Sequence, residues 1–230
     1  MKSVHQRYDI RRRSGLKTVG FIPARGGSKS IENKNLVKVN GYTLVANAIL
    51  VLRAAGIKNI WVSTDDKNIA KEAKLFGAEV IDRPTKIATD DSSTEKAIEH
   101  FLNKVDCDIV IMVQATSPML SPKDIYNGFE RLLGGDYDSL FSAVVTNDVL
   151  VWDKSMTPLN YNLHNRQTKQ TRKNITLIET GGFYIFYKKI FMKKKNRLAG
   201  KIGYCSVPFW ESFQIDSPRD LIFVERLLRK

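Results

Sequence analysis

Between residues 16 and 145, short apolar segments alternate with longer segments in which apolar residues recur every three or four positions. The short segments are typical of β-strands and the longer ones of helices of about 10–14 residues. The expected strands are 16–23, 59–63, 78–81, 109–113 and 139–145, and the expected helices are 43–55, 67–76, 95–103 and 122–133. This alternation predicts an α/β fold with a doubly wound, mostly parallel sheet.

After residue 145 the alternation stops. Residues 146–179 are polar and include the basic stretch 166–173. We expect this segment to leave the sheet, either as a lid or as an arm for dimer contact. An apolar run at 181–187 predicts a return to the sheet. Ser217-Pro218 predicts the start of a last helix, because these residues are preferred at the N-cap and the first helical position.

The predicted domain organisation has two parts. Residues 1–15 are polar and basic, and are expected to form a flexible N-terminal arm. Residues 16–230 are expected to form a single α/β domain with the excursion at about 146–180. There is no apolar run near the roughly 20 residues that span a bilayer, and the charged N-terminus lacks an apolar signal segment. Cys107 and Cys205 have no zinc spacing. We therefore expect a cytoplasmic protein with reduced thiols and no membrane partner.

The net charge of +13 is concentrated in three stretches. Residues 1–17 contain six Lys or Arg and one Asp, residues 188–201 contain seven without an acid, and residues 166–173 contain four more. The rest of the chain is slightly acidic, which differs from the uniformly basic surface of a nucleic-acid coat. We therefore expect no nucleic-acid partner. Local basic patches fit a phosphate-bearing ligand or a solvated face.

Polar clusters follow four of the expected strands. They are Arg25–Lys29, Asp65-Asp66, Arg83 and Gln114–Ser117. In a doubly wound sheet, ligands bind outside the C-terminal ends of the strands. The four clusters are therefore expected to share one site.

The first of these clusters, Arg25-Gly26-Gly27-Ser28-Lys29, is rich in glycine and cations. Backbone N–H groups, a hydroxyl and two positive charges at the end of a strand are suited to holding a polyphosphate. The loop has neither the Walker A pattern nor the spaced glycines of the dinucleotide fingerprint. It is therefore expected to bind phosphate groups in another way.

The chain resembles the acylneuraminate cytidylyltransferases, the family of CMP-sugar synthetases that activate nine-carbon keto-sugar acids, including legionaminic and pseudaminic acids. The motifs that carry the resemblance occur in the family's order over about residues 18–228. They are Ile22–Lys29 with Lys34-Asn35, Val62–Asp65, Arg83-Pro84 with Ala88–Asp90, Gln114–Pro118, Arg166-Gln167, Gly181–Tyr184 and Ile215-Asp216.

This resemblance implies a fold like that of the nucleotide-diphospho-sugar transferases and transfer of CMP from CTP to a sugar acid. It also implies Mg²⁺ and a homodimer in which the excursion crosses to the partner. The implied catalytic residues are Arg25, Lys29 and Asp216, with Asp216 as the metal ligand. The implied CTP contacts are Gly26, Gly27, Ser28, Lys34, Asn35, Arg83 and Thr94. The implied sugar-acid contacts are Gln114, Arg166 and Gln167.

The chain departs from the family pattern at four positions. The family often has Asp where Gln214 stands, so one metal carboxylate is missing. It often has Asn in place of Thr180 and Gly in place of Ser30, and the usual proline after Arg166-Gln167 is absent. These departures bear on the metal count and the choice of sugar more than on the fold.

The residues by themselves leave several alternatives open. Asp65 is either a helix N-cap or a site residue. A general base is not evident; a metal-bound hydroxide and the carboxylate of the substrate are both candidates. The acceptor could also be an eight-carbon keto-sugar acid. The chain could instead be an inactive homologue, or a basic α/β module that binds nucleic acid without catalysis.

Overall fold

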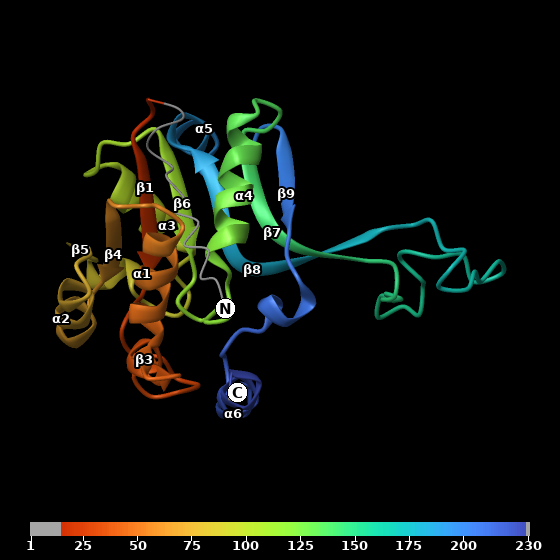
Figure 1. The fold of residues 1–230 in the computed structure, drawn as a ribbon, viewed down its shortest axis with the longest axis horizontal. Coiled ribbons are helices and arrows are strands. Elements are labelled where there is room, and N and C mark those ends of the chain that lie inside the picture. The colour runs from red at the N-terminus through yellow and green to blue at the C-terminus, as the bar shows by residue number, and fades with distance from the viewer. Residues whose placement is uncertain (1–14, 229–230) are drawn as a thin grey trace, which may run out of the picture.

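The computed structural model describes residues 15–228, so the arm expected over residues 1–15 lies almost wholly outside the described residues. Within the described part, seven strands form one sheet in the order β5-β4-β1-β6-β8-β7-β9 (Figure 1). Their bounds are β1 Thr18–Pro23, β4 Ile60–Thr64, β5 Glu79–Asp82, β6 Ile109–Val113, β7 Ser139–Thr146, β8 Thr176–Tyr187 and β9 Ile202–Ser206. All are parallel except β8, which runs antiparallel to β6 and β7. The mostly parallel sheet is confirmed.

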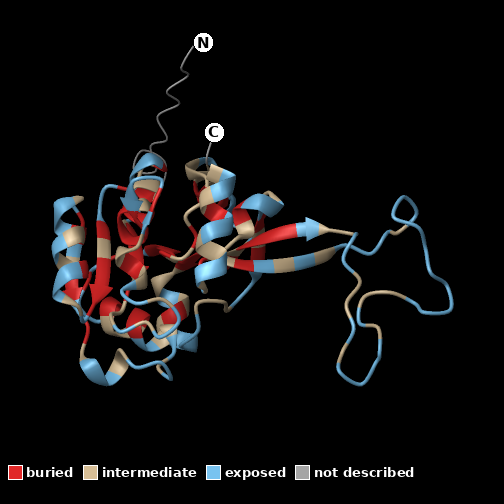
Figure 2. Ribbon diagram, turned by 90° about the horizontal axis from the view of Figure 1, so that it is seen from below, coloured by how far each residue is buried: buried red, intermediate tan, exposed pale blue. Residues whose placement is uncertain are grey.

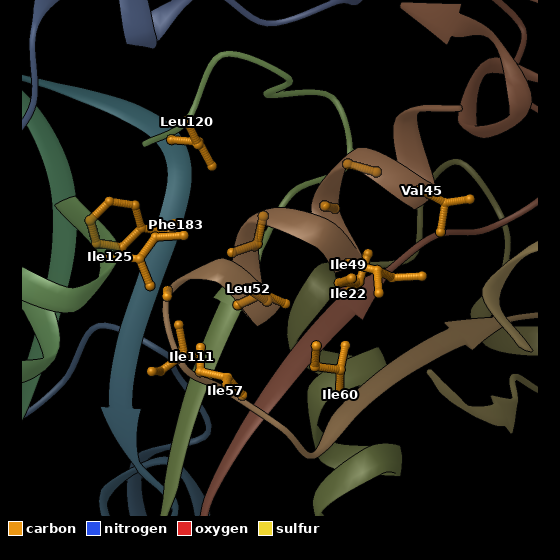
Figure 3. Packing of buried hydrophobic residues seen from close by; sticks show 14 of the residues in the cluster. Ile22, Val45, Ile49, Leu52, Ile57, Ile60, Ile111, Leu120, Ile125 and Phe183 are labelled. Carbon is orange, nitrogen blue, oxygen red and sulfur yellow. The ribbon is translucent and has the colours of Figure 1, made fainter. Parts of the chain in front are cut away.

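Helices cover both faces of the sheet, and each face has its own hydrophobic core. The helices are α1 Leu44–Ala54, α2 Lys67–Leu75, α3 Thr94–Leu102, α4 Pro122–Leu133, α5 Lys188–Lys194 and α6 Pro218–Leu228. One core contains residues of α1, α2 and α4, and the other contains residues of α3 and α5. Because side chains alternate along a strand, Phe21 of β1 packs in the second core and Ile22 in the first. Figure 3 shows Ile22 of β1 next to Ile49 of α1, with Leu52 further along the same helix.

Side-chain caps explain where several helices begin. Thr43 accepts a hydrogen bond from the N–H of Ala46 at 3.2 Å, as its position before α1 predicts. Ser121 accepts from the N–H of Lys123 at 3.2 Å, with Pro122 at the first turn of α4. Asp66 caps α2, because its carboxylate accepts from the N–H groups of Asn68 and Ile69. The cap therefore falls one residue after Asp65, the candidate considered from the sequence.

The region after β7 differs from the expectation in one detail. β8 begins at Thr176 rather than at residue 181, and it pairs with β7 as far out as Thr146. The first residues of β8 are mostly exposed or half-buried, and the two apolar ones, Leu177 and Ile178, are adjacent rather than alternating, so the strand signal in the sequence is weak. Residues 147–175 join the two strands and project away from the sheet, with mostly exposed side chains (Figure 2).

Several short elements complete the described chain. They are η2 Lys34–Leu36, η3 Thr85–Ile87 and η4 Phe209–Ser212, together with a two-stranded sheet of β2 Lys38–Val39 and β3 Tyr42–Thr43. The basic run that begins at Lys188 forms α5, a helix that the sequence reading missed, and Phe191 anchors it in the second core. Across residues 15–228, every helix is too short or too polar to cross a membrane.

Candidate active site

The C-terminal ends of β1, β4 and β5 lie side by side, because Pro23 pairs with Ser63 and Thr64 pairs with Asp82. The polar segments that follow these strands therefore meet at one edge, as predicted. Their contacts are direct: the N–H of Gly26, after β1, donates to the carboxylate of Asp65, after β4, at 2.8 Å. Arg83, after β5, donates to the backbone oxygen of Ser63 at 2.8 Å.

Two hydrogen bonds hold the glycine loop, and its backbone passes close to Asp66. Asp65 accepts from the N–H of Gly26, and the side-chain amide of Asn35 donates to the carbonyl oxygen of Arg25 at 2.8 Å. A Cβ atom at Gly26 would lie 3.0 Å from Cβ of Asp66, so the close approach of the loop to Asp66 favours glycine at this position. Asn35 is buried and acts here by holding the loop backbone. Its assignment as a CTP contact stays a prediction.

The two cations of the loop that were predicted to be catalytic, Arg25 and Lys29, share one anionic partner. Both Arg25 and Lys29 form ion pairs with Asp90, which lies in the segment between η3 and α3. Arg25 also donates to the carbonyl oxygens of Gly26 at 3.1 Å and Gly27 at 3.2 Å. The loop therefore presents its positive charge at a single point, toward the segment that leads to Thr94 at the start of α3.

Arg83 is a buried cation at the same edge. Its side chain donates to both the hydroxyl and the backbone oxygen of Ser63, and only 8% of the residue is exposed. Burial lowers the pKa of Arg83 to about 10, an effect that the charge of Asp65 opposes. The guanidinium is therefore still charged at neutral pH. Within residues 15–228 no salt bridge joins it to a carboxylate, and its hydrogen-bond partners there are the two oxygen atoms of Ser63.

The C-terminal segment returns to this edge and brings Asp216 with it. Nζ of Lys34 lies 2.9 Å from Oδ1 of Asp216, although the two residues are 182 positions apart. The segment is fixed by the N–H of Ile215, which donates to the carbonyl oxygen of Thr116 at 2.8 Å. The carboxylate of Asp220 accepts from the N–H groups of Asp216 and Ser217, so the α6 cap leaves the side chain of Asp216 free for other contacts.

Asp216 offers a divalent metal a single carboxylate ligand. Its side chain is 64% exposed and faces one lysine. Residues 15–228 contain no group of three or more His, Cys, Asp or Glu side chains placed to hold an ion. Mg²⁺ is commonly held by one or two carboxylates together with substrate phosphates and water. The donor set therefore fits a metal that arrives with a phosphate ligand rather than one bound by the protein alone.

Gln214, the departure from the family pattern, does not lie free beside Asp216. Its side-chain amide donates to the carbonyl oxygen of Thr180, a second departure from that pattern. The Gln214 amide occupies the space that a Cβ at Gly181 would need, and Nε2 of Gln114 would lie 3.8 Å from that Cβ. Gly181 has a φ of +69°, a conformation that suits glycine. Gln214, Gly181 and Gln114 therefore form one wall.

The structure gathers most of the predicted site residues at the sheet edge, but not all of them. Arg166 and Gln167 lie in the excursion, where Arg166 stacks over the ring of Tyr161 at 5.7 Å. Figure 1 shows this segment extended away from β1 and β4. In a single chain these two residues therefore do not meet the glycine loop.

Sequence reasoning missed two carboxylates near the site. Asp90 was part of a motif and a candidate cap for the helix that follows, but not a predicted site residue, and its pairing with Arg25 has no local signal in the sequence. Glu211 of η4 is buried and accepts from the N–H of Ser121 at 3.0 Å. Burial and the nearby charge of Asp124 raise the pKa of Glu211 to about 7. Glu211 thus ties the C-terminal segment to the start of α4.

Comparison with known proteins gives a consistent picture. The family model described as cytidylyltransferase matches residues 19–228. The chain is 35% identical to N-acylneuraminate cytidylyltransferase A of Danio rerio, over 95% of this chain and 53% of that protein. It is 30% identical to post-translational flagellin modification protein B of Campylobacter coli, over 91% of this chain and 94% of that protein. The chain spans about half the length of the fish cytidylyltransferases that it matches.

A solved structure of a CMP:2-keto-3-deoxy-manno-octonic acid synthetase complexed with CTP has the same fold. It superposes with a TM-score of 0.67 at 18% identity, covering 92% of this chain and 98% of the other. At this level of identity the likeness concerns the fold alone.

Proposed function

This chain belongs to the cytidylyltransferase family, and on that premise we propose that it transfers CMP from CTP to the anomeric hydroxyl of a nine-carbon keto-sugar acid and releases pyrophosphate. The observation that carries the proposal is the convergence of Arg25, Lys29 and the Lys34–Asp216 pair on one edge of the sheet. The relatives support the acceptor class, because one is an N-acylneuraminate cytidylyltransferase.

The proposed reaction is the attack of a sugar hydroxyl on the α-phosphate of CTP. Its main requirements are in-line positioning of the two substrates and stabilisation of the charge on the phosphates. Arg25 and Lys29 supply positive charge from the glycine loop, and Lys34 supplies it from η2. Arg83 and Thr94 flank the segment next to the loop and are suited to contact the cytosine or its ribose.

Asp216 would hold Mg²⁺ in the complex with CTP, with Lys34 shifting from the carboxylate to a phosphate. When bound, the metal would neutralise phosphate charge and lower the pKa of the attacking hydroxyl. Gln114 lies on the wall formed with Gly181 and Gln214, where it is suited to donate to the sugar acid. No residue of the described chain is assigned as general base.

We further propose that the excursion of one subunit completes the site of a second subunit in a homodimer. Arg166 and Gln167 lie outside the site of their own chain, and both belong to a motif of the family. Exposed apolar side chains of the excursion supply a surface for such a contact. They include Met156 at 74%, Leu159 at 62% and Ile175 at 68% exposure. A surface of this kind is typical of a segment that packs on a partner.

The experiment is to measure pyrophosphate release from CTP and Mg²⁺ with a panel of sialic, legionaminic, pseudaminic and eight-carbon keto-sugar acids. We expect turnover with a nine-carbon acid and none without an acceptor. Turnover with the eight-carbon acid alone would move the protein to another acceptor class. No turnover with any acid, together with salt-sensitive RNA binding that survives Lys29→Ala, would contradict the proposal.

A further inference from the structure

The carboxylate of Asp90 lies between the two cations of the glycine loop. One oxygen pairs with the guanidinium of Arg25, and the other lies 2.7 Å from Nζ of Lys29. About a third of the side chain, 34%, is exposed, so solvent and ligands reach it. The hydrogen bond from Lys29, together with the charge of Arg25, holds the pKa of Asp90 below its usual range. Asp90 is therefore ionised at neutral pH.

The position of Asp90 is the one that a phosphate would need. Nη1 of Arg25 donates to the carbonyl oxygens of Gly26 and Gly27, so Nη2, which contacts Asp90, carries the donors left for an anion. Phosphate and carboxylate oxygens compete for the same guanidinium geometry. A polyphosphate that engages both Arg25 and Lys29 must therefore displace the carboxylate.

We propose that Asp90 is an affinity-determining residue of the phosphate site, an internal anion that occupies Arg25 and Lys29 until a polyphosphate replaces it. This inference rests on the proposed function, because it takes the loop as the binding site of the CTP phosphates. Asp90 lies between Arg83 and Thr94 in the chain, the two expected contacts of the nucleoside. Its release therefore frees the segment that joins them, and links phosphate binding to the position of that segment.

The size of the effect follows from the competition. The apparent dissociation constant equals the intrinsic one divided by the fraction of molecules in which the cations are free. If Asp90 occupies them in most molecules, its removal tightens binding by about 3- to 10-fold. The difference must shrink in high salt, because the pair is partly exposed and salt screens it.

The test measures binding of inorganic triphosphate by calorimetry in buffer with EDTA, so that neither metal nor acceptor is involved. The variants are Asp90→Ala and Asp90→Asn. The matched control is Asp91→Asn, which changes the net charge equally at the next residue, where the side chain is exposed and forms no ion pair in the described structure. We expect about 3- to 10-fold tighter binding for both Asp90 variants and less than about 2-fold for the control.

Unchanged or weaker binding by both Asp90 variants would overturn the inference, as would equal tightening by Asp91→Asn, which would indicate a long-range charge effect. The result is separate from the test of the proposed function. Tighter triphosphate binding without turnover of CTP with any acid would support Asp90 but contradict the proposed reaction. Turnover with a nine-carbon acid, combined with unchanged triphosphate affinity in the Asp90 variants, would support the proposed reaction but contradict the role of Asp90.

Discussion

The sheet edge and the excursion differ in what holds their functional side chains. At the edge, polar residues are tied to a buried strand or to another strand's loop, as in the contacts of Asp65 with Gly26 and of Arg83 with Ser63. In the excursion the contacts are local: the side chain of Asn160 donates to the carbonyl oxygen of Val149, and the rings of Tyr161 and Trp152 meet edge to face. The residues at the edge are therefore positioned by contacts within one chain. The excursion has local structure of its own but projects away from the sheet of its own chain.

The first prediction tests whether the two regions work in different subunits. Arg25→Ala and Arg166→Ala are each expected to lower kcat/KM by about 100- to 1,000-fold, because each removes a cation from the charged transition state. Lys58→Ala, which removes an exposed cation elsewhere, is the control. An equimolar mixture of the two variants should recover about one quarter of the normal activity, because about half of the dimers are mixed and each mixed dimer holds one intact site out of two. The measurement is the rate of pyrophosphate release after mixing.

The same mixture separates the alternatives. If Arg166 served the site of its own chain, every site in a mixed dimer would lack one of the two cations and activity would stay at the level of the single variants. If Arg166→Ala alone kept normal activity, the excursion would have no part in the site.

The second prediction concerns the role of the Gln214 side chain at the sheet edge. Gln214→Ala removes the donor to Thr180 and opens space beside Gly181, so the wall that contains Gln114 loses a support. We expect the KM for the acceptor to rise about 5-fold, the effect of one lost hydrogen bond, while the KM for CTP changes by less than about 2-fold. Gln214→Glu keeps the size but cannot donate, and should behave like Gln214→Ala. A change in the Mg²⁺ dependence instead would show that position 214 faces the metal.

The third and smallest effect concerns the anchor of the C-terminal segment. The pKa of Glu211 is raised to about 7, so the folded protein binds a proton that the unfolded chain releases near its ordinary pKa of about 4.3. The free energy of unfolding therefore falls as the pH rises through this window. The Gln side chain of Glu211→Gln stays neutral and can still accept from the N–H of Ser121. The variant should therefore lose this pH dependence of the free energy of unfolding and be about 1 kcal/mol more stable than the unmodified protein at pH 8. Urea unfolding at pH 5 and pH 8 measures this, with exposed Glu79→Gln as the control. A pH dependence unchanged by Glu211→Gln would contradict the assignment.

The alternation of apolar and amphipathic segments was enough to predict the sheet, most helix starts and the polar edge. These features depend on local periodicity and on turn and cap chemistry, which leave a signal within a few residues of the chain. Where the local signal was weak, the prediction was incomplete. The outer part of β8, where exposed and half-buried side chains alternate, was missed, and α5 was hidden in a basic run around the single anchor Phe191.

What the sequence alone determined is therefore which chemical groups reach the sheet edge. Only the tertiary structure decided which of them pair. Asp65 and Asp66 are adjacent and chemically identical, yet one holds Gly26 and the other caps α2. Asp90 meets Arg25 and Lys29, Asp216 meets Lys34, and Gln214 meets Thr180 across distant parts of the chain. The physical reason is that these partners are set by strand register and helix packing, which depend on contacts over the whole domain and leave no pattern near the residues themselves.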